Sequence, residues 1–507
     1  MHRTPLALIL ASLAAPTSLA QLQVVERVSV SSTGAESTKG AGSLLDMSKD
    51  GRYVAFISQS SGLAAGDTNS TFDVFRHDRE TGTTILCSGD ATGTTGWLPS
   101  TDPSISADGR YVAFVTENAL IASDTNGEHD VYLFDAQAGT VELVSVDAGG
   151  GPADERSLGP DLNADASIVA FTSYATDLVA GDTNGEPDAY LRDRTTGTTT
   201  RVSLAPGGVQ ADDYCVNPRL NAAGDLVLFE SAASNLVPQT TSGDRAVYLA
   251  DLTAGTLELV SLAHHGQAVN GTCYASGFTD DGSQVVFYSL AQVLTPGAVP
   301  FGYHVYLRDR TAGTTTLASV DSHGQPATGQ YATITGDGRY LAWRSTAAAI
   351  GLPLINPQFS TWVVSDRVAG VTELVSGRSD GRYGNGPVMD QPLALSADGR
   401  YVAYVSEASD LIGVDTNGDP DAFVLDRRRG GMELELVGSL AGAPTQILID
   451  GGTPTSVTAL VWGVGAPGIQ GSAFGLLAMP AAPSFLLLGL DGLGSLDLSI
   501  PLPAAFA

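Results

Sequence analysis

The hydrophobic pattern of the chain consists of two short apolar runs that recur in a fixed order. The first run follows an Asp-Gly or similar pair, and its copies lie at 49–56, 107–114, 164–171, 223–229, 281–287, 336–343 and 397–404. The second run ends in Asp-x-x-x-Gly, and its copies lie at 73–82, 130–139, 188–197, 246–255, 304–313, 361–370 and 421–430. The spacing of about 56 to 61 residues indicates a sevenfold internal repeat.

Each repeat predicts four β-strands, which we call a to d. Strand a is short and ends at the Asp-Gly turn, strand b is the RYVAF-like run, strand c is the DVYLRD-like run, and strand d is a β-rich run such as TVELVSV at 140–146. Asp-Gly is a tight-hairpin signal because glycine accepts a positive φ. The Asp-x-x-x-Gly segment predicts the turn between c and d.

Seven four-stranded repeats predict an all-β fold, a seven-bladed β-propeller over residues 21–438, because one blade cannot bury both of its faces alone. An open stack of sheets is the alternative. Residues 24–31, VVERVSVS, match strand d although no strands a to c precede them, so we expect them to close the ring against the last repeat. The segment MELELVG at 432–438 also matches strand d, which leaves the closing strand open.

The motifs ADGRYVAF and DVYLFDAQAG resemble the TolB-like, WD40-like propeller repeats of exported bacterial proteins, whose hallmark is PDGKRIAF followed by DIYVMDxDG. The resemblance covers roughly residues 40 to 435. It implies a propeller fold and a mostly non-catalytic role in binding proteins or other ligands.

The two ends of the chain differ from the repeats. Residues 1–20 predict a secretory signal peptide, with Arg3 before an apolar stretch and Ser18-Leu19-Ala20 before the cleavage point. Residues 439–507 are apolar and rich in Gly and Pro, and we expect a small C-terminal β module or a sorting segment there. We therefore expect an exported protein, periplasmic, cell-surface or secreted, with no transmembrane anchor.

The formal net charge of −30 narrows the class of partner. Nucleic-acid binding needs Lys and Arg to displace the counterions of phosphates, so we expect no nucleic-acid partner. A protein or carbohydrate ligand is compatible with this charge, and we expect a monomer.

Four of the connections between strands b and c share the motif DTNxxxD, which places oxygen-bearing side chains at alternate positions. Such a pattern suits Ca²⁺, which takes six to eight oxygen ligands. The candidate ligands are Asp67, Asn69 and Asp73; Asp124, Asn126 and Asp130; Asp182, Asn184, Glu186 and Asp188; and Asp415, Asn417, Asp419 and Asp421.

The same motif also suits a network of Asx turns that only shapes the loop, and the sequence leaves both interpretations open. The motif is missing from the fourth, fifth and sixth repeats, so a blade does not need it. In a closed ring the four repeats that carry it are neighbours and form one acidic arc on the face of the long b–c and d–a loops.

The chain has three cysteines. Cys215 and Cys273 occupy the same place in neighbouring repeats, just before strand a, and we expect them to form a disulfide in an exported protein. Cys87 is expected to be free and partly buried.

Binding without catalysis is the function that the sequence favours, at the acidic long-loop face. No HExxH motif and no Gly-x-x-x-x-Gly-Lys-Ser/Thr phosphate-binding loop occurs. The alternatives are a lyase or hydrolase with its site at the mouth of the central channel, and a structural cell-surface protein. A cluster of His, Arg and Tyr at the channel mouth would favour the enzyme, and an acidic rim would favour the binding protein.

Overall fold

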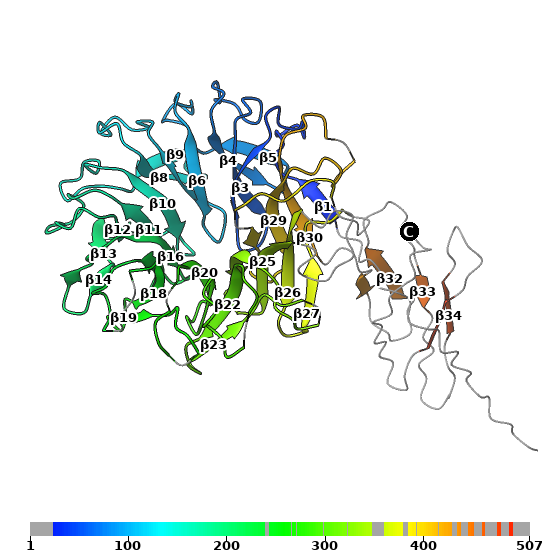
Figure 1. The fold of residues 1–507 in the computed structure, drawn as a ribbon. Coiled ribbons are helices and arrows are strands. Elements are labelled where there is room, and N and C mark those ends of the chain that lie inside the picture. Colours follow the sequence, from blue (N-terminus) through cyan, green and yellow to red (C-terminus); the bar gives the residue numbers. More distant parts are fainter. Residues whose placement is uncertain are drawn as a thin grey trace, which may run out of the picture. The chain divides into compact units, whose positions relative to one another are not determined.

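A computed structural model of the chain describes residues 24–427, apart from 239–242, 265, 270, 298, 322, 347–358, 379–383, 392 and 414, and five strands beyond residue 427. In the described part up to Arg427, strands pair into seven antiparallel four-stranded sheets arranged as the blades of a propeller (Figure 1). The predicted fold class is confirmed.

Each of the first six blades takes its strands a to d from one continuous stretch of chain. Blade 1 contains β2 (Ala41–Met47), β3 (Tyr53–Ser58), β4 (Asp73–Asp78) and β5 (Thr83–Leu86). Blade 2 contains β6 (Ser100–Ile105), β7 (Tyr111–Thr116), β8 (Asp130–Asp135) and β9 (Thr140–Leu143), and blade 3 contains β10 (Ser157–Leu162), β11 (Ile168–Ser173), β12 (Asp188–Asp193) and β13 (Thr198–Arg201).

Blades 4 to 6 repeat this order, and a two-stranded hairpin, β14 (Leu204–Ala205) with β15 (Val209–Gln210), precedes them. Blade 4 contains β16 (Cys215–Leu220), β17 (Leu226–Ser231), β18 (Ala246–Asp251) and β19 (Thr256–Leu259). Blade 5 contains β20 (Cys273–Phe278), β21 (Gln284–Ser289), β22 (His304–Asp309) and β23 (Thr314–Leu317), and blade 6 contains β24 (Gln330–Ile334), β25 (Tyr340–Thr346), β26 (Ser360–Asp366) and β27 (Val371–Leu374).

Blade 7 joins the two ends of the repeat region and closes the ring. It contains β28 (Ala394–Leu395), β29 (Tyr401–Ser406) and β30 (Asp421–Asp426), and its strand d is β1 (Val24–Arg27) from the start of the chain. The amide of Val28 donates to the carbonyl of Ala422 at 2.9 Å. Closure by the segment at 24–31 is therefore confirmed, and the other candidate strand, within 432–438, pairs elsewhere.

Strands b and c form the buried middle of each blade. In β3 and β7, every residue after the first tyrosine is buried, as expected for continuous apolar runs covered on both faces by neighbouring blades. Neighbouring blades meet through strands a and b, as between β2 and β6 or β20 and β24, so strand a lies nearest the axis.

The Asp-Gly-Arg motif links the a–b turn to the c–d turn of the same blade. In blade 1, Arg52 donates through Nε and Nη2 to the two oxygens of Asp78, at 2.9 and 2.7 Å. Hydrogen bonding to Arg52 lowers the pKa of Asp78 to about 2. The same fork-shaped pair recurs as Arg110–Asp135, Arg339–Asp366 and Arg400–Asp426.

The glycine of the a–b turn is also the place where the preceding blade approaches. Gly51 has a φ of 76°, and a Cβ there would lie 2.3 Å from the ring of Tyr401 in blade 7. Arg79 lies over that ring, 4.4 Å from its centroid, and pairs with Glu26 just before Arg27. Gly109 with Tyr53, Gly399 with Tyr340, and Arg194 with Tyr111 and Glu142 repeat parts of this contact.

The strands beyond residue 427 belong to a second compact unit. There, β31 (Glu433–Val437), β32 (Thr445–Asp450) and β33 (Ala459–Val461) form one sheet, and β34 (Phe474–Leu477) pairs with β35 (Leu486–Gly489). Strands β32 to β35 lie within the segment 439–507, whose role as a β module or a sorting segment stays a prediction. The predicted signal peptide lies outside the described residues. None of the described segments forms a helix long and apolar enough to span a bilayer.

Because β1 covers the edge of β30 and completes blade 7, deletion of residues 21–33 is expected to expose the edge of β30 and to lower the Tm markedly. Thermal unfolding followed by circular dichroism measures this. A variant that shortens the exposed c–d turn of blade 3 by deleting Thr195 and Thr196 serves as the control and should lower the Tm much less. An unchanged Tm after the N-terminal deletion would contradict closure by β1.

Candidate functional site

The four acidic loops share a hydrogen-bond frame at the start of strand c. In blade 3, Ser203 Oγ donates to Asp188 Oδ1 at 2.6 Å and accepts the amide of Ala189 at 3.2 Å. The same serine–aspartate frame forms between Ser88 and Asp73, Ser145 and Asp130, and Ser29 and Asp421. In blades 4 to 6 the serine is kept as Ser261, Ser319 and Ser376, but Ala246, His304 and Thr361 replace the aspartate. The serine is thus part of every blade, and the aspartate is an addition in four of them.

The asparagine of each motif ties the b–c loop to the d–a loop. Asn69 Nδ2 donates to the carbonyl of Gly96 at 2.7 Å, and its Oδ1 accepts the amide of Thr71 at 2.8 Å. Asn126, Asn184 and Asn417 make the same two kinds of hydrogen bond. These are Asx turns, so the four asparagines have a structural role that accounts for their conservation among the repeats.

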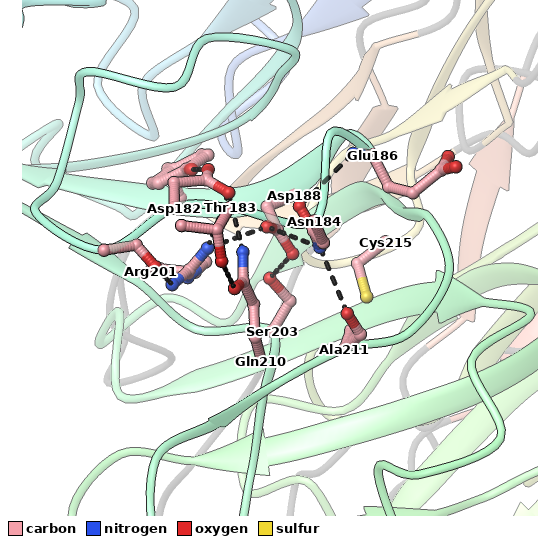
Figure 2. A network of polar contacts seen from close by, with 12 residues as sticks. Asp182, Thr183, Asn184, Glu186, Asp188, Arg201, Ser203, Gln210, Ala211 and Cys215 are labelled. Carbon is pink, nitrogen blue, oxygen red and sulfur yellow. Dashed lines mark hydrogen bonds and ion pairs between the residues drawn. The ribbon is translucent and has the colours of Figure 1, made fainter.

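In blade 3 an arginine lies between the two aspartates (Figure 2). Arg201 Nη1 is 3.1 Å from Asp182 Oδ1 and 3.0 Å from Asp188 Oδ2. Gln210 and Tyr190 also donate to Asp182. All three charged side chains are buried, and the guanidinium supplies the positive charge that a metal ion would otherwise supply.

In blade 7 the equivalent arginine of strand d, Arg27, lies beside the acidic side chains. Arg27 pairs with Asp421 at 3.0 Å and with Glu36 at 2.6 Å. Carboxylate oxygens of Glu36, Asp415 and Asp421 lie within 4.8 Å of one another, which is the spacing of a metal-ligand set. Burial raises the pKa of Asp421 to about 6, although Ser29 and Arg27 act in the opposite direction.

Blade 2 has no arginine at this place, because Leu143 pairs with Tyr132 where Arg201 pairs with Tyr190. Its aspartates use neutral donors instead. The hydroxyl of Tyr132 donates to Asp124, and Asn126 Nδ2 donates to Asp130 Oδ2 at 2.7 Å. Burial, with the neighbouring charge of Asp124, raises the pKa of Asp130 to about 6.

Blade 1 has neither the arginine nor the tyrosine. Leu86 takes the arginine position and Phe75 the tyrosine position. Asp73 is fully buried, and its Oδ2 has no hydrogen-bond partner. Burial, with the charge of nearby Asp67, raises the pKa of Asp73 to about 7.

The structure therefore brings the first and last aspartates of each motif together, but it surrounds them differently. Glu186 is exposed and points away from the pair in Figure 2, and Asp419 is half-buried. Ca²⁺ binding by the motif stays a prediction. In the loops of blades 3 and 7, an arginine side chain occupies the position between the carboxylates where the ion would lie.

A hollow on the long-loop face was missed in the sequence. It has a volume of about 340 Å³ and lies between the d–a loop that leaves blade 1 and the b–c loop of blade 2. Trp97, which is 83% exposed, lines it together with Asp90, Glu117 and Asn118. Hydrogen bonds from Thr92 and Thr94 lower the pKa of Asp90, so its carboxylate is charged. The signal in the sequence was a tryptophan within the polar stretch TGTTGWLPS, which no other repeat has.

A tyrosine-rich cluster lies at the long-loop end of strands a and b in blades 4 to 6. Arg245 lies 5.3 Å from the ring centroids of both Tyr214 and Tyr274, and it pairs with buried Glu230 at 2.7 Å. Tyr274 stacks on Tyr288 at 4.8 Å, and Tyr303 and Tyr331 extend the cluster. No histidine among the described residues joins these contacts, and the charged groups of Arg245 and Glu230 form an ion pair with each other.

The expected disulfide between Cys215 and Cys273 is wrong, since both thiols are free and buried, as is Cys87. Cys215 and Cys273 each begin strand a of their own blade, and Cys215 Sγ faces Ser231 of the same blade at 3.3 Å. Ser157 and Ser173 make the equivalent contact in blade 3. The cysteine thus takes the place of this serine. Cys215 packs in the core between blades 3 and 4, and Cys273 packs in the core between blades 4 and 5.

Comparisons with known proteins show similarity in fold. No protein-family model and no curated protein sequence matches the chain. Similar solved structures include the propeller domain of the trilobed protease from Pyrococcus furiosus, with 13% identity, 77% of this chain and 93% of that chain covered, and a TM-score of 0.47. TolB from Acinetobacter baumannii has 16% identity, coverages of 74% and 80%, and a TM-score of 0.35. Acylaminoacyl peptidase from Pyrococcus horikoshii has 11% identity, coverages of 86% and 59%, and a TM-score of 0.46.

TolB structures are thus among the matches. The expected propeller fold is confirmed by the seven four-stranded blades of the structure itself. The likeness concerns the fold of these chains.

Replacing Arg201 by Met should leave Asp182 and Asp188 buried without a positive charge. Removing one partner of a buried ion pair costs about 3–5 kcal/mol, so the Tm should fall clearly. The loss should be smaller at pH 5 than at pH 8, because burial already raises the pKa of Asp188 and protonation relieves the repulsion. Leu143→Met, at the same place in blade 2, is the control and should change the Tm little. Equal Tm values for the two variants would contradict the role of Arg201.

Proposed function

We propose that the protein is an exported, non-enzymatic propeller that binds a basic segment of a protein partner on its long-loop face. The observation that supports this most directly is the hollow beneath Trp97, which the largely exposed indole lines together with Asp90 and Glu117. Tryptophan attracts Lys and Arg side chains through its ring face more strongly than other aromatic residues.

The surroundings of the hollow suit a positively charged ligand. The net charge of −30 attracts basic partners from solution and raises their rate of association. The hollow lies between the d–a loop that leaves blade 1, which carries Asp90, and the acidic b–c loop of blade 2, which carries Glu117. A guanidinium or ammonium group over Trp97 would have carboxylates on both sides of the ring.

The same face carries further apolar anchor points. Phe301 is 84% exposed in the b–c loop of blade 5, where Val293 is also exposed, and Val209 is exposed in the connection from blade 3 to blade 4. Isolated aromatic side chains within a polar surface are typical hot spots of protein interfaces. This favours a protein partner over a single small sugar, although a carbohydrate would also fit the size of the hollow.

Export rests on the predicted leader at residues 1–20. Bound Ca²⁺ enters the proposal only at the loop of blade 1, since Arg201 and Arg27 already lie between the carboxylates in blades 3 and 7. The Tyr–Arg cluster does not favour a lyase or hydrolase, because Glu230 already accepts hydrogen bonds from Arg245, Asn217 and the amide of Ala275.

Calorimetric titration with a short Lys/Arg-rich peptide tests this proposal. We expect binding that weakens as salt rises, because charge steers and holds the peptide, and at least about a tenfold loss of affinity in Trp97→Ala, which removes an interface anchor. Val368→Ala, an equally exposed apolar residue in a c–d turn on the opposite face, is the control and should bind normally. Binding of neutral oligosaccharides with no response to the basic peptide would overturn the choice of partner.

A further inference from the structure

The four acidic loops are an internal series in which one feature varies. The backbone, the serine–aspartate frame and the asparagine tie are common to all of them. What differs is the group that compensates the two aspartates: Arg201 in blade 3, Arg27 in blade 7, and the Tyr132 hydroxyl with the Asn126 amide in blade 2. In blade 1 the two corresponding side chains are Leu86 and Phe75, which are apolar.

The consequence is a set of buried oxygen atoms in blade 1 that have no donor. Asp73 Oδ2 is one of them, although Asp73 is fully buried, and the hydroxyl of Thr71 is another. In blade 7, Asp421 Oδ2 also lacks a hydrogen bond, but it lies 3.0 Å from the guanidinium of Arg27. The carboxylate of Asp67 lies close enough to Asp73 for its charge to act on it, and Asp67 is only 8% exposed. A buried polar atom without a partner is costly, and it is far more costly when it carries charge.

We infer that the loop of blade 1 is a Ca²⁺ site, formed by the carboxylates of Asp67 and Asp73 and the hydroxyl of Thr71, and that the other three loops hold protein groups instead of an ion. All three are oxygen ligands, which is the chemistry that Ca²⁺ prefers, and its flexible coordination lets water complete the shell. Two carboxylates neutralise one Ca²⁺ ion, as Arg201 neutralises part of the charge in blade 3.

The same ion would act on the hollow beneath Trp97. Asn69 donates to the carbonyl of Gly96, and the amide of Thr68 donates to Thr95 Oγ1 at 3.3 Å. The amide of Thr95 in turn donates to the carbonyl of Gly66 at 3.2 Å. Hydrogen bonds therefore run in both directions between the b–c loop of blade 1 and the segment that carries Trp97. An ion that holds the loop in place would also hold that segment in place. The inference rests on the proposed function only for this last step.

Titration of the chelator-treated full chain with CaCl₂ tests the site without any partner. With two carboxylate ligands, we expect one site with a Kd on the order of 0.1 to 1 mM, weaker binding of MgCl₂, and a Tm that rises by about 2–4 °C in 10 mM CaCl₂. Asp73→Asn should abolish both the heat and the rise in Tm. Asp188→Asn, the matched change in blade 3, should lower the Tm but leave the response to Ca²⁺ intact.

Leu86→Arg is the second variant, because it places in blade 1 the arginine that blade 3 has. It should raise the Tm in chelator and make it independent of Ca²⁺. The emission of Trp97 gives a separate readout: CaCl₂ should shift it in the wild type and not in Asp73→Asn, and Trp97→Phe should remove the shift.

Three results would overturn the site: no heat and no change in Tm with CaCl₂, an unchanged Ca²⁺ response in both Asp73→Asn and Leu86→Arg, or a Tm that rises in Asp73→Asn in chelator while the wild type ignores Ca²⁺. The last result would mean that Asp73 carries a proton instead of facing an ion. Loss of basic-peptide binding with normal Ca²⁺ binding would overturn the proposed partner and leave this site standing.

Discussion

The contact between one blade and the next is the constraint on which the rest of the molecule depends. At the junctions of blades 7 and 1, 1 and 2, and 6 and 7, an aromatic ring at the start of strand b packs against the glycine of the following blade's a–b turn. At Gly51 a Cβ atom would lie 2.3 Å from the ring of Tyr401. Only a glycine fits there, and its φ of 76° also suits the turn. This contact joins blade 7 to blade 1 in the same way as Tyr53 and Gly109 join blade 1 to blade 2. Ring closure therefore uses the same contact that joins blade 1 to blade 2 and blade 6 to blade 7, and β1 then covers the edge of β30.

Much of this architecture could be predicted, because the repeat period and the strand patterns are local properties of the sequence. The two candidate closing strands were harder to separate. The structure shows what distinguishes them: the serine that bridges strands c and d is Ser29 in β1, whereas Gly438 stands at the matching position of the other segment. The serine recurs in every repeat, so this signal was present in the sequence, but its role became visible only with the hydrogen bond to Asp421. The disulfide prediction failed because Cys215 packs between blades 3 and 4 and Cys273 packs between blades 4 and 5, so blade 4 separates the two thiols.

At the candidate site, the sequence predicted the aspartate pairs but not the side chains that surround them. The four DTNxxxD loops look alike, and the motif correctly marked aspartates that the fold brings together. Whether the pair is compensated depends on a residue of strand d, Arg201 or Leu86, that is paired across the sheet and lies thirteen positions after Asp188 or Asp73. Cross-strand register decides which side chain faces the carboxylates, and register is a property of the assembled blade. Trp97 was missed because it lies outside every repeated pattern.

The long-loop face is divided into two unlike halves, and this division matters for recognition. Blades 7, 1, 2 and 3 carry the acidic loops, whereas blades 4 to 6 replace the last aspartate with Ala246, His304 and Thr361 and carry the tyrosine-rich cluster around Arg245 instead. A ring of seven equal blades would offer a partner seven equivalent orientations. Specific binding needs a difference in free energy between the correct arrangement and the others. The serine and the inter-blade contacts maintain the ring. The aspartates, the tyrosines and Trp97 can therefore differ from blade to blade, and this difference would leave a partner one preferred orientation on the face.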